Sequence, residues 1–508
     1  MVQRSWSRWG ALLAAPALAL TGAACAQEAD ENPLADDAVI GDRRDRGNGD
    51  GDDLGEPGTP VPADDLAALV VAAIDDVESY WTETYPEVYD GPFEPLAGGY
   101  HPYGPNTELP ICGPVPLDYE EIAGNAFYCP SEDLIAWDEA TLIPEINETF
   151  GGFTVGIVFA HEFAHAIQAR ANVGGRTIDL ELQADCYAGA WTAHVADGGS
   201  ATFEVSDDEL DSTVAGMVAI RDLPGTTEGD PAAHGSAFDR IGSFQEGYEN
   251  GPQHCADYEN TPRRTVQIPF EPEDLLAADP GNFRLEDVGP ACPEDLDERV
   301  MSGDYDRDSG EARDCGLASL LEADLNVYYV TRFEELGEVW MPIDDLVLVD
   351  PAGDEIECGG DTLGTDELRG AALYCEDENV VVIDGAELTP QLYQIGDFAF
   401  GAEVARLWSI AAQAQLGLDA SGIDASLQAD CMTGLYARSL LRQVAAGEPD
   451  SQLLEISPGD LDEGIQGFIA FGDALASETG TAFERTDALR TGVVEGIEGC
   501  ERDYGELA

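Results

Sequence analysis

Two long stretches in the first half of the chain have the pattern of buried helices. Residues 153–170 are apolar and rich in alanine, and the run stops near Gly174 and Gly175, where glycine commonly ends a helix. A second helix is expected over residues 177–196, and residues 132–138 read as a short strand before the first helix. We therefore expect an α+β fold that is mainly helical, with a small edge sheet.

Residues 1–25 have the layout of an export signal. Arg4 and Arg8 precede an apolar run over residues 11–20, and small residues then lead to Cys25. The sequence Gly-Ala-Ala-Cys resembles a bacterial lipobox, in which the cysteine is lipidated after cleavage; ordinary signal cleavage is the alternative. The apolar run is too short to span a membrane. We expect a cell-surface lipoprotein, anchored through Cys25, or a secreted protein.

Self-similarity divides the remaining chain into two related halves. Three short motifs occur twice in the same order, at residues 128–129 and 374–375, 182–186 and 427–431, and 235–238 and 480–483. We expect two related domains over residues 67–260 and 313–508. Residues 261–312, rich in Pro, Asp and Glu, read as a linker. Residues 26–66 read as a disordered acidic tether.

The cysteines repeat with the same spacing. One pair in each half is separated by 17 positions and another by 69. Of the 11 cysteines, ten remain when Cys25 is set aside, and the repeat suggests how they pair. The expected disulfides are Cys112–Cys129, Cys186–Cys255, Cys358–Cys375 and Cys431–Cys500, with Cys292–Cys315 left over. Structural zinc sites are the competing interpretation, but the chain has no Cys-x-x-Cys pair. Disulfides suit an exported protein.

Charge narrows the classes of partner. The 508 residues include 102 Asp and Glu against 23 Lys and Arg, a formal net charge of −79. Such a surface repels polyphosphate and anionic lipid headgroups, so we expect no nucleic-acid partner. The 44% hydrophobic content is too high for a chain that is disordered throughout.

One predicted helix carries a metal-binding pattern. His161, Glu162 and His165 form His-Glu-x-x-His, and side chains at i and i+4 lie on one helical face. Glu162 is offset around the helix, where it can reach a water on the metal. Glu181 and Asp185 have the same spacing on the next helix. Taken alone they could be a solvated acidic face, but zinc needs a third protein ligand, which Glu181 can supply.

These motifs resemble the gluzincin metallopeptidases and, more closely, the bacterial "putative neutral zinc metallopeptidase" family. The resemblance covers about residues 75–256 and rests on segments 126–130, 161–165, 181–189, 234–236 and 244–248. Ala164 and Asn125 depart from the family pattern, although neither is a proposed ligand. The resemblance implies a zincin-like fold in which His161, His165 and Glu181 bind Zn²⁺. It also implies that Asp185 accepts the free imidazole N–H of His161.

The resemblance further implies a zinc peptidase that is exported or associated with the membrane. Glu162 would act as general base toward water that attacks a peptide carbonyl. His234 is the candidate for a further oxyanion donor, and a loop histidine that bonds the backbone is the alternative. The strand at 132–138 corresponds to the edge strand to which gluzincins add substrate backbone, although packing alone would also explain it. His101 (in an expected turn), His194 and His254 are expected to be structural or exposed.

Aligned on the first half, the second lacks the candidate ligands. Four positions change: Ala402 stands where His161 does, Arg406 for His165, Ser426 for Glu181 and Thr479 for His234. Glu403 and Asp430 remain. We expect a degenerate copy with a structural, docking or inhibitory role, and one zinc per chain.

The sequence therefore favours an extracytoplasmic zinc peptidase that acts on peptides or proteins. A non-catalytic scaffold of the cell envelope that keeps a zinc site is the alternative. A different zinc hydrolysis, such as amidase action on cell-wall peptides, would share the metal site.

Overall fold

The computed structural model describes residues 60–62, 65–114, 116–224, 226–227, 229, 233–266, 268, 316–418, 421–446, 454, 456–472 and 479–507. The predicted signal with Cys25, nearly all of the tether, most of the linker and the Cys292–Cys315 pair lie outside the described residues.

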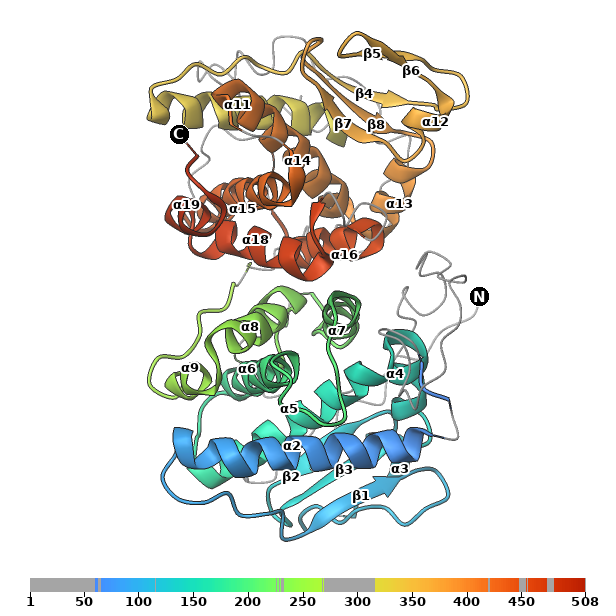
Figure 1. Ribbon diagram of the computed structural model, residues 1–508, viewed down its shortest axis with the longest axis vertical. Coiled ribbons are helices and arrows are strands. Elements are labelled where there is room, and N and C mark those ends of the chain that lie inside the picture. Colours follow the sequence, from blue (N-terminus) through green and yellow to red (C-terminus); the bar gives the residue numbers. More distant parts are fainter. Residues whose placement is uncertain are drawn as a thin grey trace, which may run out of the picture.

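The first half is mainly helical (Figure 1). Its helices are α2 (Leu66–Val88), α3 (Tyr119–Ile122), α4 (Leu142–Phe150), α5 (Gly152–Ala171), α6 (Thr177–Ala196), α7 (Asp207–Ala219), α8 (Ala237–Asn250) and α9 (Pro252–Asp257). Strands β1 (Gly99–Tyr103), β2 (Ala126–Cys129) and β3 (Leu134–Asp138) form one sheet. Helices α5 and α6 confirm the two predicted helices, and β3 confirms the predicted strand.

Helix α5 ends before the glycines that were expected to stop it. Its C-cap, Asn172, takes the left-handed conformation at φ 55°, and the N–H of Val173 donates to the Gln168 carbonyl. Asparagine tolerates this conformation better than most residues that have a Cβ atom. Gly174 and Gly175 therefore lie in the loop that leads to α6.

The sheet contradicts two predictions. Its strand order is β1-β3-β2, with β1 parallel and β2 antiparallel to β3. The strand predicted at 132–138 therefore lies at the centre of the sheet, and its backbone groups are already paired on both sides. The edge beside α5 belongs to β2 instead. His101 lies in β1, opposite Ala136, and not in a turn, because residues 99–103 pair with β3 along their whole length.

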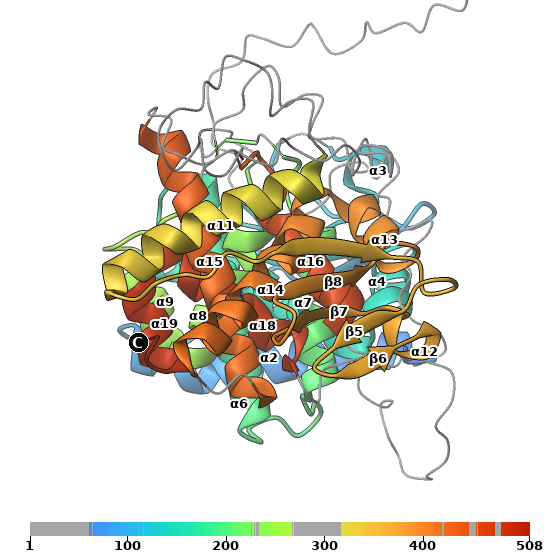
Figure 2. The same ribbon diagram turned by 90° about the horizontal axis from the view of Figure 1, so that it is seen from above.

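The second half has a similar succession of elements (Figures 1 and 2). Its helices are α11 (Leu317–Leu336), α12 (Thr365–Leu368), α13 (Leu388–Ile395), α14 (Asp397–Leu416), α15 (Gly422–Ala446), α16 (Asp460–Gly472), α18 (Ala482–Val494) and α19 (Ile497–Tyr504). Strands β4 (Asp345–Val349), β8 (Val380–Asp384) and β7 (Ala372–Cys375) form a sheet in that order, again with one parallel and one antiparallel pair. Strands β5 (Ile356–Cys358) and β6 (Asp361–Leu363) form a separate hairpin.

Four disulfides join the cysteines that the repeat had paired. They are Cys112–Cys129, Cys186–Cys255, Cys358–Cys375 and Cys431–Cys500. Disulfides of this number are typical of proteins that fold outside the reducing cytoplasm.

In each half, a glycine allows two helices to approach closely. A Cβ atom added to Gly247 of α8 would lie 1.8 Å from the carbonyl oxygen of Cys186 on α6. A Cβ atom added to Gly492 of α18 would likewise lie 2.0 Å from the carbonyl oxygen of Cys431 on α15. Because no side chain separates the backbones, α8 is held firmly against α6, the helix that carries Glu181.

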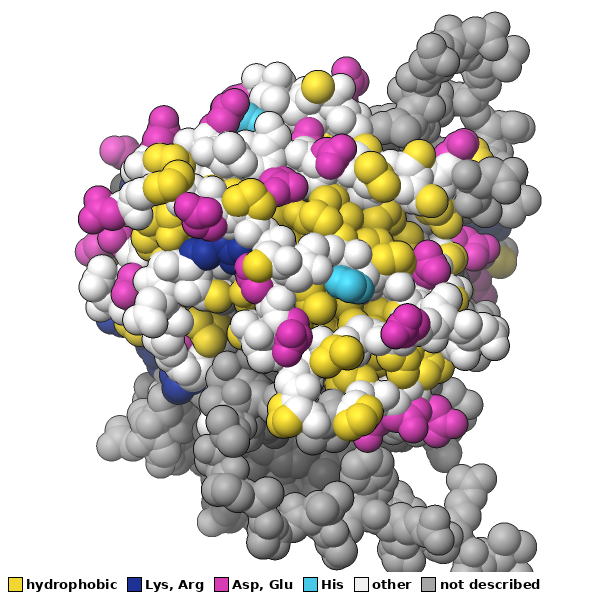
Figure 3. Space-filling view, turned by 90° about the horizontal axis from the view of Figure 1, so that it is seen from below, with side chains coloured by type: hydrophobic (Ala, Val, Ile, Leu, Met, Phe, Trp, Pro, Cys, Tyr) yellow, Lys and Arg dark blue, Asp and Glu magenta, His cyan; other side chains and the backbone are white. Residues whose placement is uncertain are grey.

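The halves are stacked, with α7 and α8 of the first facing α16 and α18 of the second (Figure 1). Figure 3 views the molecule from below, where hydrophobic side chains gather among scattered acidic ones. Within the described residues, no helix combines the length and the apolar character that a membrane span requires.

Candidate metal centre

Helices α5 and α6 bring three candidate ligands to one point. The Nε2 atoms of His161 and His165 lie 3.2 Å apart. An oxygen of Glu181 lies 3.3 Å from the first nitrogen and its other oxygen 3.5 Å from the second. All three side chains are largely withdrawn from solvent.

These separations match a zinc site. With Zn–N bonds of about 2.0–2.1 Å, two ligands of a tetrahedral Zn²⁺ lie about 3.3 Å apart. Oε2 of Glu181 is buried and has no hydrogen-bond donor in the described structure, as expected of an atom that faces a cation. The side chains present therefore fit the metal that the sequence predicted.

The far nitrogens of both imidazoles are held by acceptors. Nδ1 of His161 lies 2.8 Å from Oδ1 of Asp185, and Nδ1 of His165 lies 2.9 Å from Oε1 of Gln168. The amide of Gln168 is oriented by its NH₂ group, which donates to the Leu180 carbonyl. With each Nδ1 carrying the proton, both Nε2 lone pairs point at the same place, where a cation would relieve their repulsion.

Electrostatics support the same protonation states. Burial lowers the pKa of His165, so this imidazole is neutral. Burial by itself would raise the pKa of Glu181, but positive charge within this ligand group, on His165 first and then on His161, outweighs burial and holds that pKa well below its usual range. Glu181 is therefore a carboxylate, and the three groups form a ligand set with one negative charge.

Arg240 on α8 fixes Asp185 in turn. Its Nε donates to Oδ2 of Asp185 at 2.8 Å and its Nη2 to Oδ1 at 2.9 Å, with both side chains buried. Burial would raise the pKa of Asp185, but Arg240 and His161 together lower it. Sequence reasoning missed Arg240, because nothing local marks a residue 55 positions away as a partner. Gln168 could have been found, since it lies at i+3 from His165 on the same helix.

Glu162 lies beside the ligand group, against the edge strand β2. Its Oε2 accepts the Tyr128 N–H at 2.8 Å, and its side chain is buried. Burial raises the pKa of Glu162 to about 8, although the nearby His161 opposes the rise. The carboxyl group can therefore hold or release a proton near neutral pH.

His234 precedes α8 and is held by Asp222. The His234 N–H donates to Oδ2 of Asp222 at 2.7 Å, the Gly235 N–H donates to the same oxygen, and Nδ1 of His234 lies 3.3 Å from Oδ1. His234 also contributes to the low pKa of Glu181, which places it near the ligand group. The structure thus brings His161 and His165 to Glu181, and the charge of a protonated His234 would act on the same carboxylate.

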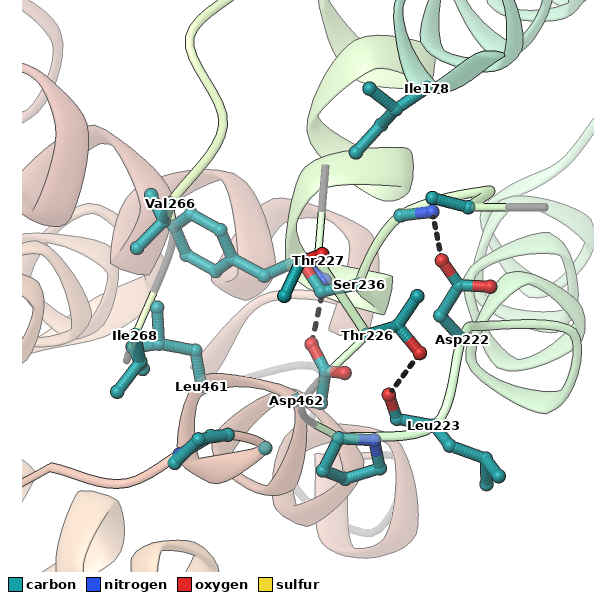
Figure 4. A pocket seen from close by; sticks show the side chains of 16 residues that line it. Ile178, Asp222, Leu223, Thr226, Thr227, Ser236, Val266, Ile268, Leu461 and Asp462 are labelled. Atoms are coloured by element: carbon teal, nitrogen blue, oxygen red, sulfur yellow. Dashed lines mark hydrogen bonds between the residues drawn. The ribbon is translucent and has the colours of Figure 1, made fainter. Parts of the chain in front are cut away.

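A cavity of about 60 Å³ lies on the other side of the Asp222 loop (Figure 4). Ile178 and Asp222 of the first half and Leu461 and Asp462 of the second are among the residues that line it. None of the three candidate ligands lines this cavity, so it is separate from the metal centre.

Comparison with known proteins agrees with the geometry. Residues 120–258, which include all of the site residues above, match the sequence family described as "Putative neutral zinc metallopeptidase".

Two proteins similar to this chain show how far the similarity extends. An uncharacterized protein of Mycobacterium tuberculosis is 28% identical over 214 residues, which are 37% of this chain and 69% of the relative. The uncharacterized protein YpfJ of Escherichia coli is 24% identical over 229 residues, 38% of this chain and 72% of the relative. No solved structure matches significantly.

The three remaining histidines stand apart from the candidate metal centre. His101 is exposed and its Nε2 bonds the Gly98 carbonyl, the ring of His194 lies 5.0 Å from that of Tyr80, and His254 lies 3.4 Å from Glu246. This placement agrees with the structural or exposed roles expected of them.

In the second half, Arg406 stands where the sequence alignment places His165 of the first half. Arg406 donates to the Ser426 hydroxyl at 2.8 Å, and its Nε lies 3.2 Å from Asp430. Arg485 pairs with Asp430 as Arg240 does with Asp185. Glu403 lies 3.6 Å from Arg406. The guanidinium of Arg406 thus lies between two carboxylates and a hydroxyl group.

Proposed function

We propose that the first half is a zinc-dependent peptidase that hydrolyses peptide bonds outside the cytoplasm. One observation carries the proposal: two neutral imidazoles and a buried carboxylate converge with the spacing of a zinc tetrahedron, and Glu162 lies beside them. The match to the zinc metallopeptidase family supports the same reaction.

His161, His165 and Glu181 would hold the zinc and leave one position open. When bound, zinc supplies a Lewis acid that polarises a carbonyl and acidifies water. Glu162 takes the proton from the attacking water and passes it to the leaving amine. Burial favours the neutral form of Glu162, so the accepted proton stays on this side chain until it is transferred to the leaving nitrogen. Asp185 keeps His161 in the tautomer that the metal needs.

His234 is proposed to stabilise the oxyanion that develops on the substrate carbonyl. Asp222 accepts from its backbone N–H and lies beside its Nδ1, so Nε2 can serve as the donor in the imidazolium form, in which both ring nitrogens carry a proton. The substrate backbone would lie along β2, since this edge strand, and not β3, runs beside Glu162.

We further propose that residues 313–508 are a degenerate copy of residues 67–260 and bind no catalytic zinc. The matched strand orders, disulfide spacings and Asp–Arg pairs support a duplication. The four disulfides support export, with Cys25 as the candidate lipid anchor.

The test measures bound zinc and cleavage of a broad peptide library by residues 60–508, with Glu162→Gln as control. We expect one zinc in both proteins and cleavage by the wild type alone. Loss of the general base should lower the rate by roughly 100- to 10,000-fold. Wild-type protein that binds zinc but cleaves no better than Glu162→Gln would refute the peptidase and favour the non-catalytic scaffold.

A further inference from the structure

The interface between the halves includes two reciprocal contacts. Asp462 on α16 of the second half accepts the backbone N–H of Phe238 at 2.8 Å and that of Ala237 at 3.2 Å, at the start of α8 (Figure 4). Asp211 on α7 of the first half accepts the N–H of Phe483 at 2.8 Å and that of Ala482 at 3.1 Å, at the start of α18. Each half thus completes a helix N-terminus of the other.

These N-termini depend on the partner half for their hydrogen bonds. The first N–H groups of a helix have no partner within the helix. In α8 the hydroxyl of the N-cap Ser236 accepts only the Asp239 N–H, and Asp462 accepts the two N–H groups before it. Asp462 is buried, and its negative charge lies at the positive end of the helix dipole. The start of α8 is therefore positioned by the second half.

The first turn of α8 is connected to the metal centre through hydrogen bonds of Arg240. Arg240 lies two residues after Phe238, and it holds Asp185, which orients His161. A second series of contacts connects Asp462 to His234. It begins at Arg221, whose Nε lies 3.4 Å from Asp462. The next residue, Asp222, holds the backbone of His234.

We propose that Asp462, supplied by the second half, is a positioning residue for the metal centre of the first half. The inference rests on the metal site of the proposed function but does not require peptide cleavage. It gives the second half a definite structural role, because this half completes the first turn of α8 and so keeps Arg240, Asp185 and His161 aligned for the metal.

The reciprocal contact provides a matched control. Asp211 caps α18 with nearly identical distances, but the residues beyond it in the second half are Arg485, Asp430 and Arg406, none of which is a candidate ligand. Loss of either aspartate removes an equivalent capping contact from the interface, whereas only Asp462 bears on the zinc ligands.

The experiment compares Asp462→Ala, Asp462→Asn and Asp211→Ala in residues 60–508. Zinc affinity is measured by competition with a chromogenic chelator, and the visible spectrum of the Co²⁺-loaded protein reports ligand geometry. Both alanine variants should melt at similarly lowered temperatures. We expect Asp462→Ala to weaken zinc binding roughly tenfold and to alter the Co²⁺ spectrum, with the isosteric Asp462→Asn between it and the wild type. Asp211→Ala should match the wild type in both.

The outcomes separate the two proposals. Wild-type affinity and spectrum in the Asp462 variants, or equal losses in the Asp462 and Asp211 variants, would overturn the positioning role and leave the proposed function intact. Wild-type protein that binds no zinc would overturn both. Should Asp462→Ala fail to fold, Asp462→Asn and Asp211→Asn provide the same comparison.

Discussion

Replacing Asp185 with asparagine should weaken zinc binding and destabilise the fold for two separable reasons. The carboxylate bonds Nδ1 of His161 and forms a two-point ion pair with Arg240, and both charged side chains are buried. The amide keeps the volume but loses the charge, so the buried guanidinium loses its carboxylate counter-charge.

The expected losses of folding stability and of zinc affinity can be given in magnitude. Breaking a buried pair by removing one partner costs about 3–5 kcal/mol of folding free energy. Loss of the carboxylate that orients a metal-binding imidazole typically weakens metal affinity roughly 10- to 100-fold. In the double variant Asp185→Asn/Arg240→Gln both charges are gone. Folding stability should partly recover, whereas zinc affinity should stay low because His161 still lacks its carboxylate.

Chemical denaturation and competitive zinc titration measure the two quantities, and the second half supplies the control. Asp430 pairs with Arg485 as Asp185 does with Arg240 and also lies beside Arg406, so Asp430→Asn should destabilise the fold at least as much. It should leave zinc affinity unchanged. Equal loss of zinc affinity in Asp430→Asn and Asp185→Asn, or wild-type affinity in Asp185→Asn, would refute the reasoning.

Three other changes have defined outcomes. Burial raises the pKa of Asp397, and burial together with the charges of Asp460 and Asp397 raises the pKa of Glu463 well above its ordinary value. The folded state therefore binds extra protons and loses stability as pH rises above the ordinary carboxyl range. Asp397→Asn should raise the melting temperature at pH 7.5 but not at pH 4, and equal shifts at both would contradict this. Gly247→Ala would place a Cβ atom 1.8 Å from the carbonyl oxygen of Cys186 and should markedly lower the melting temperature. Gly174→Ala, whose added Cβ atom would meet nothing within 4 Å, should not. Chelation should also lower the melting temperature, since free zinc at 1,000 times its Kd stabilises by about 4 kcal/mol; the triple variant His161→Ala/His165→Ala/Glu181→Ala, which lacks the ligands, should not respond.

The chemistry of the site could be predicted from the sequence because it is local. The i, i+4 spacing of His161 and His165 determines that both imidazoles share a face of any α-helix, and Glu181 and Asp185 repeat that spacing on the next helix. The four disulfides were also predictable, since the repeated cysteine spacings select one pairing among many.

The predictions that failed depended on contacts between distant segments. The strand at 132–138 exists, but its position at the centre of the sheet follows from pairing with β1, which no local pattern indicates. Likewise, His101 lies in β1 and not in a turn because residues 99–103 pair with β3.

By itself the sequence determined the ligand types, their spacing along two helices and the loss of these ligands from the second half. Only the tertiary structure decided what holds them in place. Arg240 meets Asp185 across 55 residues, and Asp462 meets Phe238 across 224. Helical periodicity follows from backbone geometry and can be read in a short window. The partner of a buried charge is decided by how whole helices pack, which no short window contains.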